Sequence, residues 1–244
     1  MISLPRIEYI NRLIDESLAE GDDSIELKGK FIGDEGVEAL VQSDRLGEIE
    51  DLDLSKNSIT WRGAVHLFSC DRFKKLKRLY LKENNIADKG AFAMAEAPFL
   101  EGLSVLDICF NNIETSGGAA IANCPRFSKL QVLNLQENQV GDETLIALAK
   151  NSQFGNLRKL NFYRTGISVM GIKVLAKSKV LKKVKHLNLG RNYLHPDSAK
   201  ALANTKTLLN IETLLMMENY LADEGVKSIM DSKSFTKLKT FKVL

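Results

Sequence analysis

The sequence predicts an α/β fold: a right-handed, horseshoe-shaped solenoid with about nine short parallel strands on its concave side, helices on its convex side and an N-terminal capping helix. Three observations predict it. Leucines recur every 27 residues, the apolar spacing changes from two to helical within each period, and an amphipathic segment precedes the first period. The recurring leucines are Leu52, Leu79, Leu106, Leu133, Leu160, Leu187 and Leu214, with Ile25 before them and Phe241 after them.

Residues 1–21 are predicted to form one amphipathic helix. Pro5 suits the first turn, Ile10 and Ile14 share one face, and Gly21 is a stop signal. Counting by one period places Ile10 over Val37, so this helix resembles a unit that has lost its strand and now caps the core. We therefore expect a single domain with a cap at 1–21 and an array at 22–244.

Each period of the array predicts a strand followed by a helix. In the third unit, Leu79 and Leu81 alternate with variable positions, which is typical of a short strand with one buried face. After Asn84 the spacing becomes helical, and Asp88 is a suitable N-cap for the helix of its own unit. Right-handed helical crossovers between parallel strands place all strands on one face and all helices on the other.

An asparagine recurs where each strand turns away, because an amide there can both donate to and accept from unpaired backbone groups. This asparagine ladder consists of Asn57, Asn84, Asn111, Asn138, Asn192 and Asn219. Thr165 and Lys30 interrupt it, so we expect a weaker turn at Thr165 and a more exposed first unit at Lys30. Glycines in a second column predict tight helix entry or close backbone approach, at positions 36, 63, 90, 117, 171 and 225.

The sequence ends within a ninth predicted strand, residues 238–244. An open sheet edge invites pairing, and Lys237, Lys239 and Lys242 are charges that discourage it. Either these charges protect the edge or the natural chain continues. The edge also offers a route to a homo-oligomer.

The pattern L-x-x-L-x-L-x-x-N, repeated in register over about residues 22–244, resembles the leucine-rich-repeat family. The helix in each unit resembles the ribonuclease-inhibitor-like, intracellular subclass. This resemblance implies a curved solenoid that recognises proteins through its concave sheet without catalysis. The regularity is similar to that of bacterial or parasite members, some of which act as effectors inside host cells. A rival in the same fold is a regulator of a small GTPase, as in the Ran GTPase-activating branch, whose functional residues do not map onto this chain.

The variable strand positions point away from the core, so we expect a protein partner to bind there. The last three full units gather tyrosine, arginine and methionine, which are enriched in protein interfaces. The predicted partner-binding residues are Tyr80, Asp107, Phe110, Tyr163, Arg164, Arg191, Tyr193, Leu215, Met217 and Tyr220. For Tyr193 and Tyr220, stacking between adjacent units to shield the turn is an equally good interpretation.

Charge is distributed unevenly along the chain. Basic and acidic side chains number six and fifteen in residues 1–60, ten and ten in 61–149, and eighteen and six in 150–244. The uneven charge is consistent with compositional drift of exposed positions, with electrostatic steering of a partner and with head-to-tail contact between copies. Glu26, Asp51 and Asp53 form an acidic patch that we expect to meet a basic partner, because a cation site would need further oxygen ligands.

The sequence gives no sign of an enzyme, a cofactor or a metal. The histidines fall in different columns, Cys109 and His186 would lie roughly 14 Å apart, and no zinc spacing or phosphate-binding loop occurs. Cys70, Cys109 and Cys124 suit a reducing, cytoplasmic setting, and no membrane-spanning segment is predicted. A nucleic-acid binder is a second rival, although the basic C-terminal half lacks aromatic residues alternating with lysines.

Overall fold

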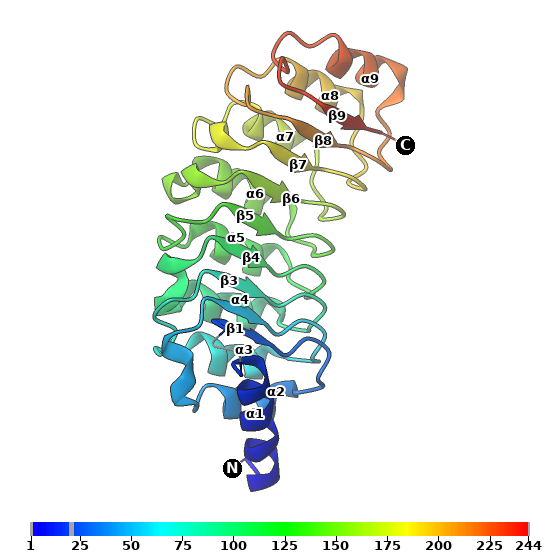
Figure 1. The fold of residues 1–244 in the computed structure, drawn as a ribbon. Coiled ribbons are helices and arrows are strands. Elements are labelled where there is room, and N and C mark those ends of the chain that lie inside the picture. Colours follow the sequence, from blue (N-terminus) through cyan, green and yellow to red (C-terminus); the bar gives the residue numbers. More distant parts are fainter. Residues whose placement is uncertain (1, 20–21, 244) are drawn as a thin grey trace.

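The computed structural model describes residues 2–19 and 22–243. Within them, one open sheet of nine parallel strands runs in chain order, and helices cover its other side (Figure 1). The predicted fold class is confirmed. The strands are β1 (Ser24–Glu26), β2 (Asp51–Asp53), β3 (Arg78–Tyr80), β4 (Val105–Asp107), β5 (Val132–Asn134), β6 (Lys159–Asn161), β7 (His186–Asn188), β8 (Thr213–Leu215) and β9 (Thr240–Lys242).

Nine α-helices lie in the described part of the chain. They are α1 (Leu4–Ser17), α2 (Gly33–Leu40), α3 (Trp61–Phe68), α4 (Ala87–Glu96), α5 (Thr115–Asn123), α6 (Gly141–Lys150), α7 (Val169–Leu175), α8 (Pro196–Ala203) and α9 (Ala222–Met230). Short 3₁₀ segments shape four of the return loops, at Asp44–Gly47, Pro98–Gly102, Ser152–Asn156 and Leu181–Lys183.

The register of the sheet follows the sequence period. Leu52 pairs with Leu79, and Leu79 with Leu106, so the same column of each unit stacks on the next. These leucines are fully buried, as are the residues two positions later, such as Leu81 and Ile108. Stacking of neighbouring units removes the apolar side chains from water, and no single unit could do this alone.

The asparagine ladder ties each turn to the next. The Asn111 amide donates to the carbonyls of Leu81 at 2.9 Å and Ile108 at 3.1 Å. The Asn138 Oδ1 in turn accepts from the backbone N–H groups of Asn111 at 3.1 Å and Ile113 at 3.0 Å. One side chain therefore satisfies backbone groups of two units, which a turn without it would leave unpaired.

Thr165 keeps only part of this pattern. Its hydroxyl donates to the Phe162 carbonyl at 2.9 Å, within its own unit. In the preceding unit, the N–H groups of Asn138 and Val140 have no hydrogen bond to a described group. The turn is buried and intact, but it has fewer bonds to its neighbour than the other turns of the ladder have.

The prediction that Asp88 caps its own helix is wrong. Helix α4 begins one residue before Asp88, and the Asp88 carboxylate accepts from the Glu114 N–H at 2.7 Å and from the Ser116 hydroxyl of the next unit. Asp34 accepts likewise from Thr60, and Asp142 from Ser168. We call this contact the inter-unit latch, because the acid caps the helix of the following unit.

Three glycines of the column, Gly63, Gly117 and Gly171, make room for the latch. A Cβ atom added at Gly63 would lie 2.5 Å from the Asp34 Oδ1, so any larger side chain would push the carboxylate away. The Gly63 N–H itself donates to this oxygen at 3.0 Å. The predicted close approach therefore involves an acidic side chain of the preceding unit.

Helix α1 covers the first unit (Figure 1). Its Ile10 and Ile14 are buried in the same core as Val37. Two side chains of α1 cap carbonyls of the first turn: Arg6 donates to Phe31 at 2.9 Å, and the Tyr9 hydroxyl to Lys30 at 3.3 Å. The helix ends at Ser17, and the predicted stop at Gly21 lies outside the described residues.

Strand β9 lies at the other end of the sheet and pairs with β8. It is shorter than the predicted strand, and Leu244 lies outside the described residues. Lys239 donates to Glu212 at 2.8 Å, so one of the edge lysines is engaged in an ion pair. No described helix is both long and apolar enough to cross a membrane.

Candidate protein-binding surface

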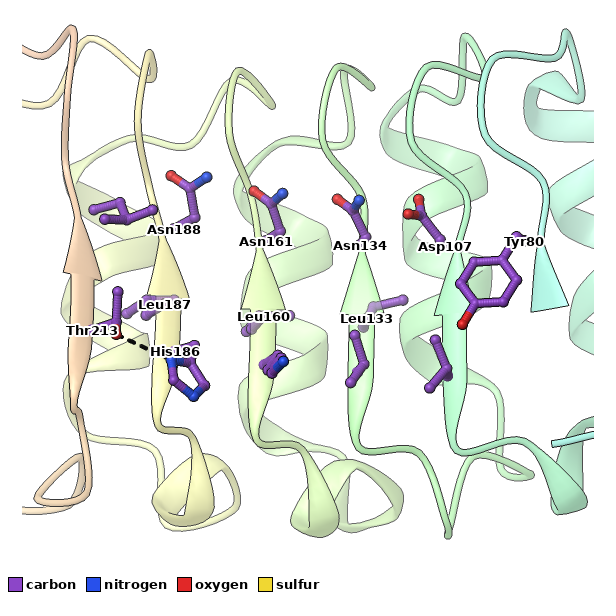
Figure 2. A pocket seen from close by; sticks show the side chains of 14 residues that line it. Tyr80, Asp107, Leu133, Asn134, Leu160, Asn161, His186, Leu187, Asn188 and Thr213 are labelled. Carbon is purple, nitrogen blue, oxygen red and sulfur yellow. Dashed lines mark hydrogen bonds between the residues drawn. The ribbon is translucent and has the colours of Figure 1, made fainter. Parts of the chain in front are cut away.

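A groove of about 480 Å³ runs over the concave face from β3 to β8 (Figure 2). Its lining comes mainly from two outward columns, one on each side of the buried strand leucine. Of the predicted partner-binding residues, the structure places Tyr80, Asp107 and Leu215 in this groove. The groove therefore joins predicted residues of three units along one surface.

Asn134, Asn161 and Asn188 form a row on consecutive strands, with Asp107 next in line (Figure 2). Each asparagine Oδ1 accepts a hydrogen bond from the backbone N–H two residues later, at 3.0 to 3.1 Å. Because the oxygen is engaged, the NH₂ group is the part of the amide that remains for a ligand. Only the Asn161 amide donates to another described side chain, Gln136, at 3.0 Å. The row thus offers hydrogen-bond donors, and Asp107, held in the same way, offers a carboxylate oxygen.

Sequence reasoning missed the second column of the groove, formed by the residues that precede each strand leucine. Val105 and Val132 give this column an apolar floor, and Lys159 adds a cation that forms no ion pair among the described residues. His186 Nδ1 lies 3.1 Å from the Thr213 Oγ1 (Figure 2). The sequence pattern contains this second column, because the residues on either side of a buried strand position point to the same face of the sheet.

Four other predicted residues lie beside the C-terminal end of the groove, and together with Glu218 we call them the C-terminal rim: Tyr163, Arg164, Arg191 and Met217. The Tyr163 hydroxyl donates to Glu218 at 2.6 Å, across two units. Arg191 lies 3.6 Å from Glu218, and Arg164 donates to Glu137 at 2.6 Å. Met217 is half-buried, and its carbonyl accepts the Arg191 N–H at 2.8 Å. Within the rim, the side chains of Tyr163, Arg191 and Glu218 form a connected group, and Arg164 is fixed by Glu137 of the preceding unit.

Tyr163 reaches Glu218 because Gly190 lies on its path. A Cβ atom at Gly190 would lie 2.7 Å from the Tyr163 Cδ2, so the ring crosses this unit only over a glycine. The hydrogen bond to the Glu218 carboxylate raises the pKa of Tyr163, since the carboxylate favours the protonated hydroxyl. Glu218 is not among the residues that the sequence predicts to bind a partner.

The remaining predicted residues lie in the turns after the strands. Tyr193 and Tyr220 stack with ring centroids 6.0 Å apart, as their shared column predicts. Both still expose more than half of their surface, 63% and 59%, so stacking leaves a large aromatic area available. Phe110 has a left-handed backbone, φ 54°, and is 37% exposed. It lies in the column that also holds Arg164.

The acidic patch carries less free charge in the structure than the sequence alone predicts. Arg78, on the neighbouring strand, pairs with Asp51 and neutralises it. Asp53 accepts the Ser55 N–H at 2.8 Å, and Glu26 is exposed. Within the described ranges, no group of three or more histidine, cysteine, aspartate or glutamate side chains is arranged to hold a metal ion.

Comparison with known proteins agrees with this geometry. The family model described as Leucine Rich repeat matches residues 74–95, 103–122 and 128–149, which span β3 to β5 and the helices α4 to α6 apart from one terminal residue of each of the three helices. No curated protein matches the chain significantly. The same columns and register continue on both sides of the matched segments, from β1 to β9. The chain therefore belongs to the leucine-rich-repeat family.

Proposed function

We propose that this protein is a non-catalytic interaction module that binds a protein partner through its concave face and C-terminal rim. Leucine-rich repeats generally mediate protein–protein interaction. The observation that carries the proposal is the Tyr163–Glu218 hydrogen bond across two units. This bond fixes a large aromatic side chain on the surface, where the side chain is not needed for packing the core.

Such a surface suits binding for two reasons. Side chains that are already fixed lose less conformational entropy when a partner covers them. Tyrosine, arginine and methionine also bury a large area while keeping a polar or adaptable group, and they dominate interface energies. The rim and the stacked Tyr193 and Tyr220 together offer these residue types on adjacent units.

The buried cysteines support a role without catalysis. Cys70, Cys109 and Cys124 are free, and burial raises the pKa of each thiol. A thiol that stays protonated near neutral pH is a poor nucleophile. Free thiols also fit a cytoplasmic location, and the helix in each unit fits the ribonuclease-inhibitor-like subclass; both belong to the proposal.

A capture experiment tests the proposal. The wild type, a Tyr163→Ala, Arg191→Ala variant and a Phe92→Ala control are immobilised and exposed to one lysate, and bound proteins are identified by mass spectrometry. Phe92 is 47% exposed on α4, on the opposite side of the array. We expect the wild type and the control to retain a partner that the rim variant loses. Equal recovery by the rim variant, with its fold verified by circular dichroism, would move the binding surface elsewhere.

A further inference from the structure

The groove on the concave face contains three chemically different regions in a fixed order. Near β3 and β4 lie the Tyr80 ring and the Asp107 carboxylate. Val105 on β4 and Val132 on β5 form an apolar floor, and beyond them lie Lys159 and Asn161 on β6 and Asn188 on β7. A ligand that matches all three regions must carry complementary groups in the same order.

The charges at the two ends of this order are available. Asp107 and Lys159 form no ion pair among the described residues. Two cations of the preceding unit are already engaged, since Lys82 is 3.2 Å from Glu83 and Arg78 is paired with Asp51. A basic group on a ligand would therefore find a free carboxylate at one end, and an acidic group would find a free ammonium at the other.

The row of asparagine amides adds to the preference of the Lys159 end of the groove for a hydrogen-bond acceptor on the ligand. Asn134, Asn161 and Asn188 each have the oxygen bonded to their own strand, so they present N–H groups. Together with the ammonium of Lys159, these donors suit a carboxylate better than any cation. In the first region, Tyr80 favours a cationic group of the ligand, since the face of its ring attracts cations.

The dimensions match an extended polypeptide. Neighbouring strands lie about 4.8 Å apart, so the path from Tyr80 and Asp107, on β3 and β4, to Lys159 on β6 is roughly 12 Å long. In an extended chain, side chains i, i+2 and i+4 point to one side and span about 13 Å. Three alternate side chains of such a segment would therefore reach the carboxylate, the apolar floor and the donors in turn.

We propose that the groove binds an extended segment of the partner with a basic, an apolar and an acidic side chain at alternate positions, ordered from β3 towards β7. This inference rests on the proposed function and specifies its ligand. The apolar side chain packs on Val105 and Val132, between a cation held by Tyr80 and Asp107 and a carboxylate held by Lys159. The order, more than the composition, decides affinity.

Six labelled peptides of identical composition test this order. Each carries one Lys, one Leu and one Glu at alternate positions with Ser between them and Gly at both ends, in the six possible orders, and binding is measured by fluorescence polarisation. We expect at least one of the two peptides with central Leu to bind about tenfold more tightly, equivalent to 1.4 kcal/mol, than each of the other four. Equal affinities for all six, or no saturable binding up to millimolar peptide, would overturn the proposal.

Two matched variants locate the binding. Lys159→Glu should abolish the preference for central Leu, whereas Lys173→Glu, an exposed lysine of α7 on the other side of the array, should leave it unchanged. An equal effect of both changes would also count against the groove. The capture experiment separates the two proposals: a partner that depends on the rim, together with six equivalent peptides, would refute only the ordered groove. A partner retained by both the rim variant and Lys159→Glu would refute the proposed function.

Discussion

The inter-unit latch predicts a large effect for a small change on the convex side. Asp34 accepts three hydrogen bonds from the next unit: from the Thr60 N–H at 2.7 Å, the Thr60 hydroxyl at 2.6 Å and the Gly63 N–H at 3.0 Å. Asp34→Ala removes a charged acceptor from the first turn of α3. Losing one charge-assisted bond and the favourable charge at the helix N-terminus should cost about 2 to 3 kcal/mol of unfolding free energy.

The chain supplies a matched control in the same column. Asp223 follows a residue with positive φ, Ala222, just as Asp34 follows Gly33, but it is exposed and accepts no hydrogen bond within the described residues. Asp223→Ala should therefore change the unfolding free energy by less than about 0.5 kcal/mol. Urea unfolding followed by circular dichroism measures both variants.

A double-mutant cycle tests whether the latch is the cause. Gly63→Ala places a Cβ atom 2.5 Å from the Asp34 Oδ1 and 2.9 Å from the Ile59 Cγ2. In the presence of Asp34 it expels the carboxylate, whereas in Asp34→Ala the contacts with Ile59 and, at 3.1 Å, with the Cα atom of residue 34 remain. The two changes should therefore be less than additive by about 1 to 2 kcal/mol. Additive costs, or an Asp223→Ala variant as unstable as Asp34→Ala, would refute the reasoning.

Three further changes test other contacts. Thr165→Asn should restore the missing bonds to the preceding turn and raise the unfolding free energy by about 1 kcal/mol, measured by urea unfolding; an unchanged midpoint would contradict this. Gly190→Ala should displace the Tyr163 ring from its carboxylate partner, so that ultraviolet titration finds a lower pKa for this tyrosine. Two lysines lower the pKa of Glu212 from 4.5 to about 2, so its contribution to stability is complete above pH 4.5 and is lost as the pH falls towards 2. Glu212→Gln should therefore flatten the acid limb of a stability profile, and an identical limb would exclude this pair as a source of acid sensitivity.

The fold could be predicted because its cause is repeated in every unit. A slip of one residue in any strand would turn Leu79 or Leu106 from the core to the solvent, so only one register buries all the leucines. The same periodicity identifies the outward positions. It could have identified Val105 and Val132 as well, had both neighbours of each buried leucine been considered.

Contacts between units were harder to predict. An aspartate just inside a predicted helix is by local rules a cap for that helix, and nothing local shows that Asp88 reaches the next unit. The Tyr163–Glu218 bond joins residues 55 positions apart, through a gap that exists only because Gly190 has no side chain. Such contacts depend on the stacking geometry, which the sequence pattern implies but does not specify atom by atom.

Two kinds of contact join the units of the array: the inter-unit latch in the first six units and the rim near the C-terminal end. In the described residues the latches of Asp34, Asp88 and Asp142 join the first six units in pairs, and the units of β7 and β8 lack an equivalent contact. There the Tyr163–Glu218 bond, on the surface, spans the units instead. The side chains that we propose to meet a partner are therefore also side chains that hold this end of the array together. A partner that preserves the bond stabilises these units, and one that breaks it loosens them, so binding and local stability are linked at this end.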